Sequence, residues 1–100
     1  YQVIIIRKGA HTSITFPGEK IWFNITGNPS LAKGGTGDIL TGVIAGLIAQ
    51  GYSPSEAALF GVWLHGKAAD IAIKSIGVES VDSDDINRGI KKIFRELNSL

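Results

Sequence analysis

The segment GNPSLAKGGTGD, residues 27–38, constrains the fold more than any other part of this 100-residue chain. It stands directly before the run ILTGVIAGLI, in which apolar residues recur at the helical period. The segment therefore predicts a tight loop that leads into the first turn of a helix. The first N–H groups of a helix lack intrahelical partners, and the helix dipole makes that end positive. Since Gly34, Gly35 and Gly37 carry no Cβ, we expect a phosphate-sized anion to reach these groups.

The residues before this loop predict β-structure. Gln2–Arg7 is a short apolar run rich in β-branched residues, typical of a strand buried on both faces in a parallel sheet. The segments 12–16 and 20–26 flank the turn signal Pro-Gly-Glu, which predicts a hairpin near a sheet edge.

The residues after the loop predict three helices. The first runs from Asp38 to about Gly51, and its glycines, Gly42 and Gly46, suggest close approach to a neighbouring backbone. A capping box, Ser-Pro-Ser-Glu at residues 53–56, starts a second helix that is apolar on most faces and should be largely buried. A third begins at Asp82 or Ser83, with its acids at the start and its basic residues in the later turns. A strand, a hairpin and three helices indicate part of an α/β layered domain.

Composition excludes several classes of protein. A net charge of +1 argues against nucleic acid or an anionic membrane surface as the partner. There is no cysteine, and two histidines, His11 and His65, are too few for a metal cluster, so no protein-held metal is expected. No apolar run approaches the length of a membrane span, and we expect a cytoplasmic protein. The chain lacks methionine and opens at Tyr1 within a predicted strand, so we expect it to be a piece of a longer chain.

Asp38 is the residue that distinguishes a working site from a simple turn. A carboxylate beside a bound phosphate is electrostatically unfavourable unless it has a task there. That task would be to orient a substrate hydroxyl and accept its proton as the oxygen attacks phosphorus. The alternative is that Asp38 only caps the helix, a common arrangement. The loop lacks the endings of a P-loop or a dinucleotide fingerprint, so it is a different solution to phosphate binding.

The segments GNPSLAKGGTGDILTGVIAGLIAQG and SPSEAALFGVWLHGKAADIA resemble the carboxy-terminal domain of YjeF-type proteins. These are the ADP/ATP-dependent NAD(P)H-hydrate dehydratases of the ribokinase-like superfamily. The resemblance runs from Ile4 to about Ile90 and implies a ribokinase-like three-layer α/β/α sandwich, with residues 1–100 as its C-terminal part. It implies a metabolite-repair lyase that removes water from the S epimer of hydrated NADH or NADPH. The co-substrate would be ADP, giving AMP and phosphate, or ATP, with Mg²⁺ on the phosphates.

The resemblance also implies the residues of the site. Asp38 matches the catalytic aspartate that meets the hydrated nicotinamide. Two segments match the nucleotide-binding stretches of the family; they comprise Lys8, Gly9, Ala10, His11 and Thr12, and then Asn28, Pro29, Ser30, Leu31, Ala32, Lys33, Gly34, Gly35, Thr36 and Gly37. At positions 30–33 this chain departs from the Gly-Met-Ala-Thr of many members but keeps the spacing.

Two other functions also fit these residues. A ribokinase-like kinase for a pyrimidine or thiazole alcohol would use the same anion site and base, and would keep the phosphorylated product. A non-catalytic nucleotide-binding module would need the loop only for packing, and it would tolerate Asn at position 38. His65 is expected to be a hydrogen-bonded core residue, and the glycine-containing and apolar helices suggest a homo-oligomer.

Overall fold

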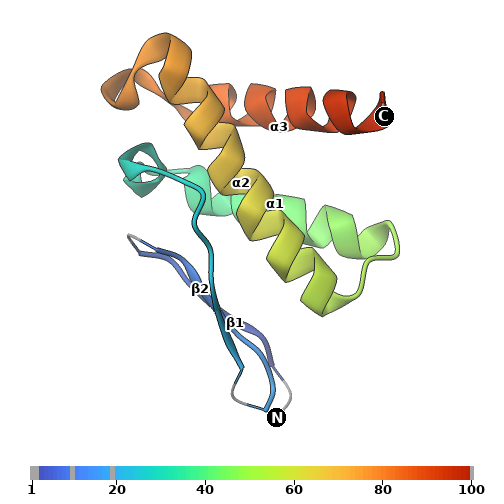
Figure 1. Ribbon diagram of the computed structural model, residues 1–100. Helices are drawn as coiled ribbons and strands as arrows, with labels where there is room; N and C mark the ends of the chain where they lie inside the picture. The colour runs from blue at the N-terminus through green and yellow to red at the C-terminus, as the bar shows by residue number, and fades with distance from the viewer. Residues whose placement is uncertain (1–2, 10, 19, 100) are drawn as a thin grey trace.

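The computed structural model describes residues 3–9, 11–18 and 20–99. A small sheet lies beside a layer of three helices, and the longest helix runs between the other two (Figure 1). In chain order the elements are β1 (Ile5–Arg7), β2 (Ser13–Thr15), β3 (Ile21–Phe23), a 3-10 turn η1 (Pro29–Ala32), α1 (Thr36–Ala49), α2 (Pro54–Ile76), a 3-10 turn η2 (Val78–Ser80) and α3 (Ser83–Asn98).

The sheet has the order β1-β2-β3, and both pairs of strands are antiparallel. The predicted hairpin is confirmed as β2 and β3, and the Phe16 N–H donates to the Lys20 carbonyl at 2.8 Å beside the turn. The expectation for the first strand was wrong in two respects. β1 pairs antiparallel with β2, and Ile5 is 52% exposed rather than buried. A short β-branched run fits an exposed edge strand as well as a buried one, because periodicity does not separate the two over so few residues.

α1 begins at Thr36, two residues before the predicted start, and Gly35 is its N-cap with a φ of 90°. Gly51, with a φ of 102°, follows its end. The close approach expected at Gly42 and Gly46 was wrong. A Cβ built on either glycine meets nothing within 4 Å in the part of the chain that is described.

α2 begins with the predicted capping box and ends at Gly77. The Glu56 N–H donates to Ser53 Oγ at 3.1 Å, and the Ser53 N–H donates to Glu56 Oε1 at 2.8 Å. The helix is not buried all round, because Leu59 and Trp63 are each 37% exposed.

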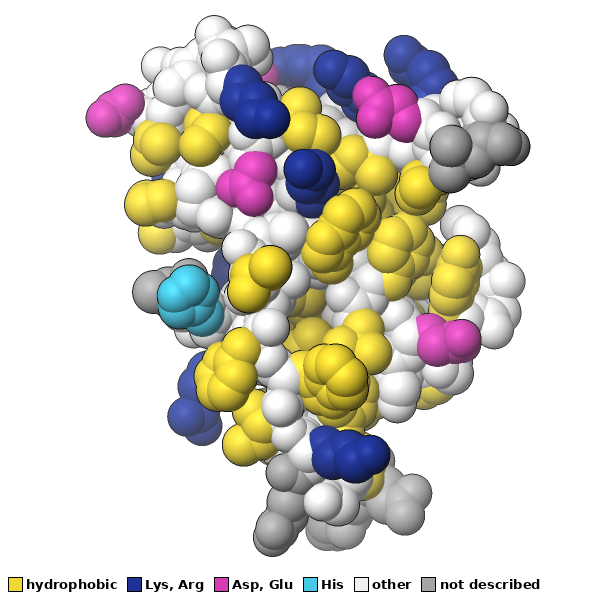
Figure 2. Space-filling view, in the orientation of Figure 1, with side chains coloured by type: hydrophobic (Ala, Val, Ile, Leu, Met, Phe, Trp, Pro, Cys, Tyr) yellow, Lys and Arg dark blue, Asp and Glu magenta, His cyan; other side chains and the backbone are white. Residues whose placement is uncertain are grey.

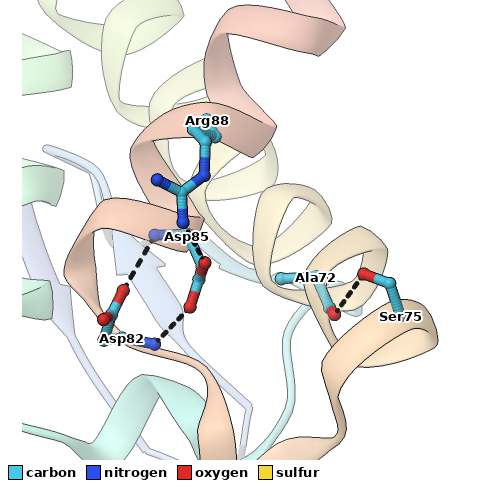
Figure 3. A network of polar contacts seen from close by, with 5 residues as sticks. All are labelled: Ala72, Ser75, Asp82, Asp85 and Arg88. Carbon is cyan, nitrogen blue, oxygen red and sulfur yellow. Dashed lines mark hydrogen bonds and ion pairs between the residues drawn. The ribbon is translucent and has the colours of Figure 1, made fainter.

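α3 begins with a second capping box, shown in Figure 3. The Asp85 N–H donates to Asp82 Oδ1 and the Asp82 N–H to Asp85 Oδ2, both at 3.0 Å, while Arg88 pairs with Asp85. The backbone N–H of Asp82 is the main reason why the pKa of Asp85 lies below its usual value. These acids therefore start a helix, as predicted, and Asp82 rather than Ser83 is the cap.

Two apolar clusters hold the elements together. One joins α2 to α3 around Leu64 and Ile86, both fully buried. The other joins the sheet to α1 and α2 through Ile14, Leu40 and Val62. No helix among the described residues combines the length and hydropathy that a membrane crossing requires.

Candidate functional site

A cavity of about 800 Å³ opens where the glycine loop meets α2 and the turn after β1. Its wall is built from three stretches of chain that are distant in sequence, within residues 8–12, 24–40 and 62–66. They contribute Lys8, Gly9, Thr12, Asn24, Thr26, Gly27, Asn28, Pro29, Leu31, Ala32, Lys33, Gly34, Gly35, Thr36, Gly37, Leu40, Val62, His65 and Gly66.

Most of the residues predicted for nucleotide binding lie on this wall. The exceptions are His11 and Ser30, which are not among the lining residues, and Ala10, which lies outside the described residues. His11 is exposed on the turn after β1, and Ser30 is buried inside η1. The structure thus brings together the Lys8 turn and the glycine loop, which are separated by about twenty residues in the sequence.

Asp38 occupies the third position of α1, next to the cavity wall at Gly37 but not part of it. Asp38 is exposed. The N-cap of the helix is Gly35, and no side chain donates or accepts a capping hydrogen bond there. The capping role considered for Asp38 is therefore not the one it has here. A carboxylate in the first turn is favoured by the helix dipole, and its oxygens remain accessible from solvent.

Lys8 reaches across the cavity mouth to the start of α1. Its Nζ donates to Thr36 Oγ1 at 3.3 Å, and a Cβ on Gly37 would stand 3.7 Å from that Nζ. The Thr36 hydroxyl lies 2.6 Å from the Leu31 carbonyl and 3.0 Å from that of Lys33. An ammonium is thus held beside the positive end of a helix, an arrangement suited to an anion.

The side-chain ammonium of Lys33 binds backbone carbonyls before α3, although its sequence position predicted contact with a nucleotide. Its Nζ donates to the carbonyls of Glu79 and Val81, the latter at 2.7 Å. The side chain therefore ties the glycine loop to the segment before α3, although its residue also lines the cavity.

His65 is the buried titratable group on the cavity wall. It is 3% exposed, and its Nε2 has no hydrogen-bond partner among the described residues. Burial and, after it, the charge of Lys8 lower the pKa of His65 to about 4, although a backbone hydrogen bond to Thr36 acts in the opposite direction. The imidazole is therefore neutral near pH 7, and it adds no charge to the site.

Sequence reasoning missed part of the wall. Asn24 and Thr26, which follow β3, and Gly66, on α2, belong to no motif from which the sequence could have predicted them. They face the cavity because the chain after β3 crosses α2 closely. A Cβ on Gly66 would lie 2.2 Å from Thr26 Oγ1.

A family model described as NAD(P)H-hydrate dehydratase matches residues 1–92. The chain belongs to the NAD(P)H-hydrate dehydratase family. It is 40% identical over 97 residues to a bifunctional NAD(P)H-hydrate repair enzyme Nnr of Moorella thermoacetica, covering 97% of this chain and 18% of that protein. It is 49% identical over 70 residues to an ADP-dependent (S)-NAD(P)H-hydrate dehydratase of Bacillus subtilis, covering 70% of this chain and 25% of that one.

The dehydratase family also accounts for the fold. A crystal structure of an ADP/ATP-dependent NAD(P)H-hydrate dehydratase from Bacillus subtilis, co-crystallised with ATP and Mg²⁺, superposes with a TM-score of 0.87 at 35% identity. The match covers 93% of this chain and 34% of that enzyme. The ribokinase-like α/β fold expected from the sequence is thereby confirmed. The chain spans about a fifth to a third of the length of these relatives.

Proposed function

We propose that this chain forms the nucleotide-facing part of an NAD(P)H-hydrate dehydratase, and that residues 1–100 are the C-terminal part of its domain. The observation that carries the proposal is the cavity between Lys8 and the N-terminal end of α1, with the carboxylate of Asp38 directly beside it. A cation, a glycine loop and free helix N–H groups favour the phosphates of ADP or ATP. A carboxylate that does not cap its own helix is available for proton transfer.

In the proposed reaction, the hydroxyl oxygen of the hydrated nicotinamide attacks the terminal phosphorus of the nucleotide. Asp38 accepts the hydroxyl proton as the new oxygen–phosphorus bond forms, and AMP leaves when the nucleotide is ADP. Loss of phosphate from the ring carbon, with a proton from the neighbouring carbon, restores the dihydropyridine. Asp38 can act as the base because the proton moves late and the reaction depends mainly on positioning.

Mg²⁺ fits this proposal as a partner of the nucleotide. No group of three or more acidic or histidine side chains that could hold a metal occurs in the described residues. Asp82 and Asp85 are used in a helix cap. Nucleotide phosphates commonly supply the oxygens for this ion, which would neutralise part of their charge.

The test uses a full-length protein that contains this chain, as wild type and as Asp38→Asn. Each is given hydrated NADH and Mg²⁺ with ADP or ATP, while NADH absorbance and free phosphate are followed. We expect NADH to return in step with phosphate, and the variant to be about 10²–10⁴-fold slower, the usual contribution of a general base. Wild type that recovers no NADH with either nucleotide would rule out this substrate, and pyrimidine and thiazole alcohols would then be tried as phosphate acceptors.

A further inference from the structure

Asp70, on α2, is joined to the glycine loop by two hydrogen bonds. Its Oδ2 accepts from the Gly27 N–H at 3.0 Å, and its Oδ1 accepts from the Asn28 side-chain amide at 2.9 Å. The carbonyl oxygen of the same amide makes a further hydrogen bond. Asn28 Oδ1 accepts from the Ser30 N–H at 3.0 Å and so caps η1. One carboxylate thus fixes both the backbone and the side chain at the start of the loop.

The same face of α2 holds the chain just before the loop. Thr26 Oγ1 donates to the Trp63 carbonyl at 3.0 Å, and Gly66 leaves the space in which Thr26 crosses the helix. Trp63, Gly66 and Asp70 follow one another at spacings of three and four residues, so they lie on one helix face. The position of the loop start is therefore set by α2.

The charge of Asp70 has no evident use in holding an anion. Gly27, Asn28 and Pro29 line the cavity, whereas Asp70 stands behind them and is half-buried. A negative charge behind a phosphate site weakens phosphate binding by Coulomb repulsion. Both of its oxygens, however, face N–H donors of the loop, and hydrogen bonds to an ionised acceptor are the stronger kind.

We propose that Asp70 is a positioning residue for the nucleotide. Its carboxylate holds Gly27 and Asn28 where the loop backbone and the Asn28 side chain meet the phosphates. This inference rests on the proposed function, because it presumes that the cavity takes a nucleotide. In this proposal Asp70 contacts no reacting atom. It affects the binding of the nucleotide and not that of the hydrated nicotinamide.

The first test is Asp70→Asn in the full-length protein. Loss of one charge-assisted hydrogen bond is expected to raise the KM and the Kd for ADP about tenfold. The KM for hydrated NADH should stay within about twofold. Tighter ADP binding by the variant would mean that repulsion dominates, and equal losses for both substrates would mean a general structural role. Either result overturns the proposal.

A reciprocal exchange tests the contact itself. With Asp70→Asn and Asn28→Asp combined, the amide at 70 can donate to the carboxylate at 28, which still accepts from the Ser30 N–H. Asn28→Asp alone sets two carboxylates face to face and should bind ADP most weakly. We expect the double variant to bind ADP at least threefold more tightly than Asn28→Asp alone, since any repulsion between position 28 and phosphate is common to both. No recovery would overturn the proposal.

Two controls keep this result separate from folding and from the proposed function. Asp84→Asn removes a carboxylate from an exposed position on α3 and should leave ADP binding unchanged. If Asp70→Asn does not fold, Asn28→Ala removes the Asn28 half of the link, together with the cap on the Ser30 N–H, and must show the same split between substrates. ADP titration calorimetry is run without hydrated NADH. Wild type that binds a nucleotide but recovers no NADH refutes only the proposed reaction, and wild type that binds neither ADP nor, in a matched titration, ATP refutes both.

Discussion

His65 couples the stability of the fold to pH, because the structure keeps this imidazole neutral. Burial and the charge of Lys8 set its pKa at about 4, against 6.5 for an ordinary histidine. Between these two values the unfolded chain binds a proton that the folded chain does not. Protonation of His65 therefore does not reduce the free energy of unfolding above pH 6.5. As the pH drops from 6.5 towards 4, it lowers that free energy by at most about 1.4 kcal/mol per pH unit.

The measurement is the urea midpoint of the full-length protein at pH 7.5 and pH 5, for wild type and His65→Gln. Between the two pH values wild type should lose more stability than the variant, because only wild type has His65. The pH effect of the carboxylates is common to both proteins and cancels in the comparison. His11→Gln, which changes an exposed histidine, serves as the control and should follow wild type. An equal loss in wild type and His65→Gln would show that His65 is protonated in the folded state.

At the scale of single residues, the sequence predicted the site through its motifs and missed what lies outside them. The glycine loop was predicted because glycines before a helix start match a chemical task, and Lys8 was predicted through the resemblance to the family; both line one cavity. Asp70 was not found, since an acid in a helix carries no sign of a partner 42 or 43 positions away. Such contacts depend on how the elements pack, and one sequence does not contain that information.

At the scale of elements, the helices and the hairpin were predictable because their signals are local. Capping boxes, glycine stops and turn residues act within a few positions, and the structure follows them. The partner of β1 and the use of each helix glycine are not local, and there the predictions were wrong. Within the helices, a Cβ would come within 3.0 Å of another segment of the chain at Gly61, Gly66 and Gly89, whereas it would meet nothing within 4 Å at Gly42 and Gly46.

Substitution of these glycines separates helix propensity from packing. Gly66→Ala places a Cβ 2.2 Å from Thr26 Oγ1 and 2.6 Å from the Thr26 carbonyl carbon, so backbone must move. We expect a loss of about 1–3 kcal/mol in the free energy of unfolding of the full-length protein, despite alanine's better propensity. Gly42→Ala, with open space around its Cβ, should instead gain about 0.5–1 kcal/mol. Thermal and urea unfolding of both variants test this. A stabilised Gly66→Ala would contradict the crossing of Thr26 over α2, and a destabilised Gly42→Ala would mean that another surface covers this part of α1.

At the scale of the whole molecule, apolar surface is spread over the sheet and over one side of the helices. Figure 2 shows apolar side chains gathered over much of the face that it presents. β3 is an edge strand on which Trp22 and Phe23 are 53% and 68% exposed, and Ile25 beyond it is 88% exposed. A chain of this size buries only about two-thirds of its unfolded surface, so such exposure leaves little margin of stability.

The isolated 100-residue chain is therefore expected to fold poorly and to self-associate. An apolar edge strand offers unpaired backbone groups to a second chain, and the exposed side chains favour that pairing. Scanning calorimetry should give a broad transition without a clear cooperative peak, and sedimentation should detect species larger than the monomer. Phe23→Lys combined with Ile25→Lys should reduce the association, since charge on an edge strand opposes pairing. The full-length protein, under the same conditions, should unfold cooperatively if, as proposed, this chain is part of a larger domain that covers this surface. A sharp calorimetric transition from a monomeric 100-residue chain would instead mean that the two apolar clusters, around Leu64 and around Ile14, suffice to hold the fold.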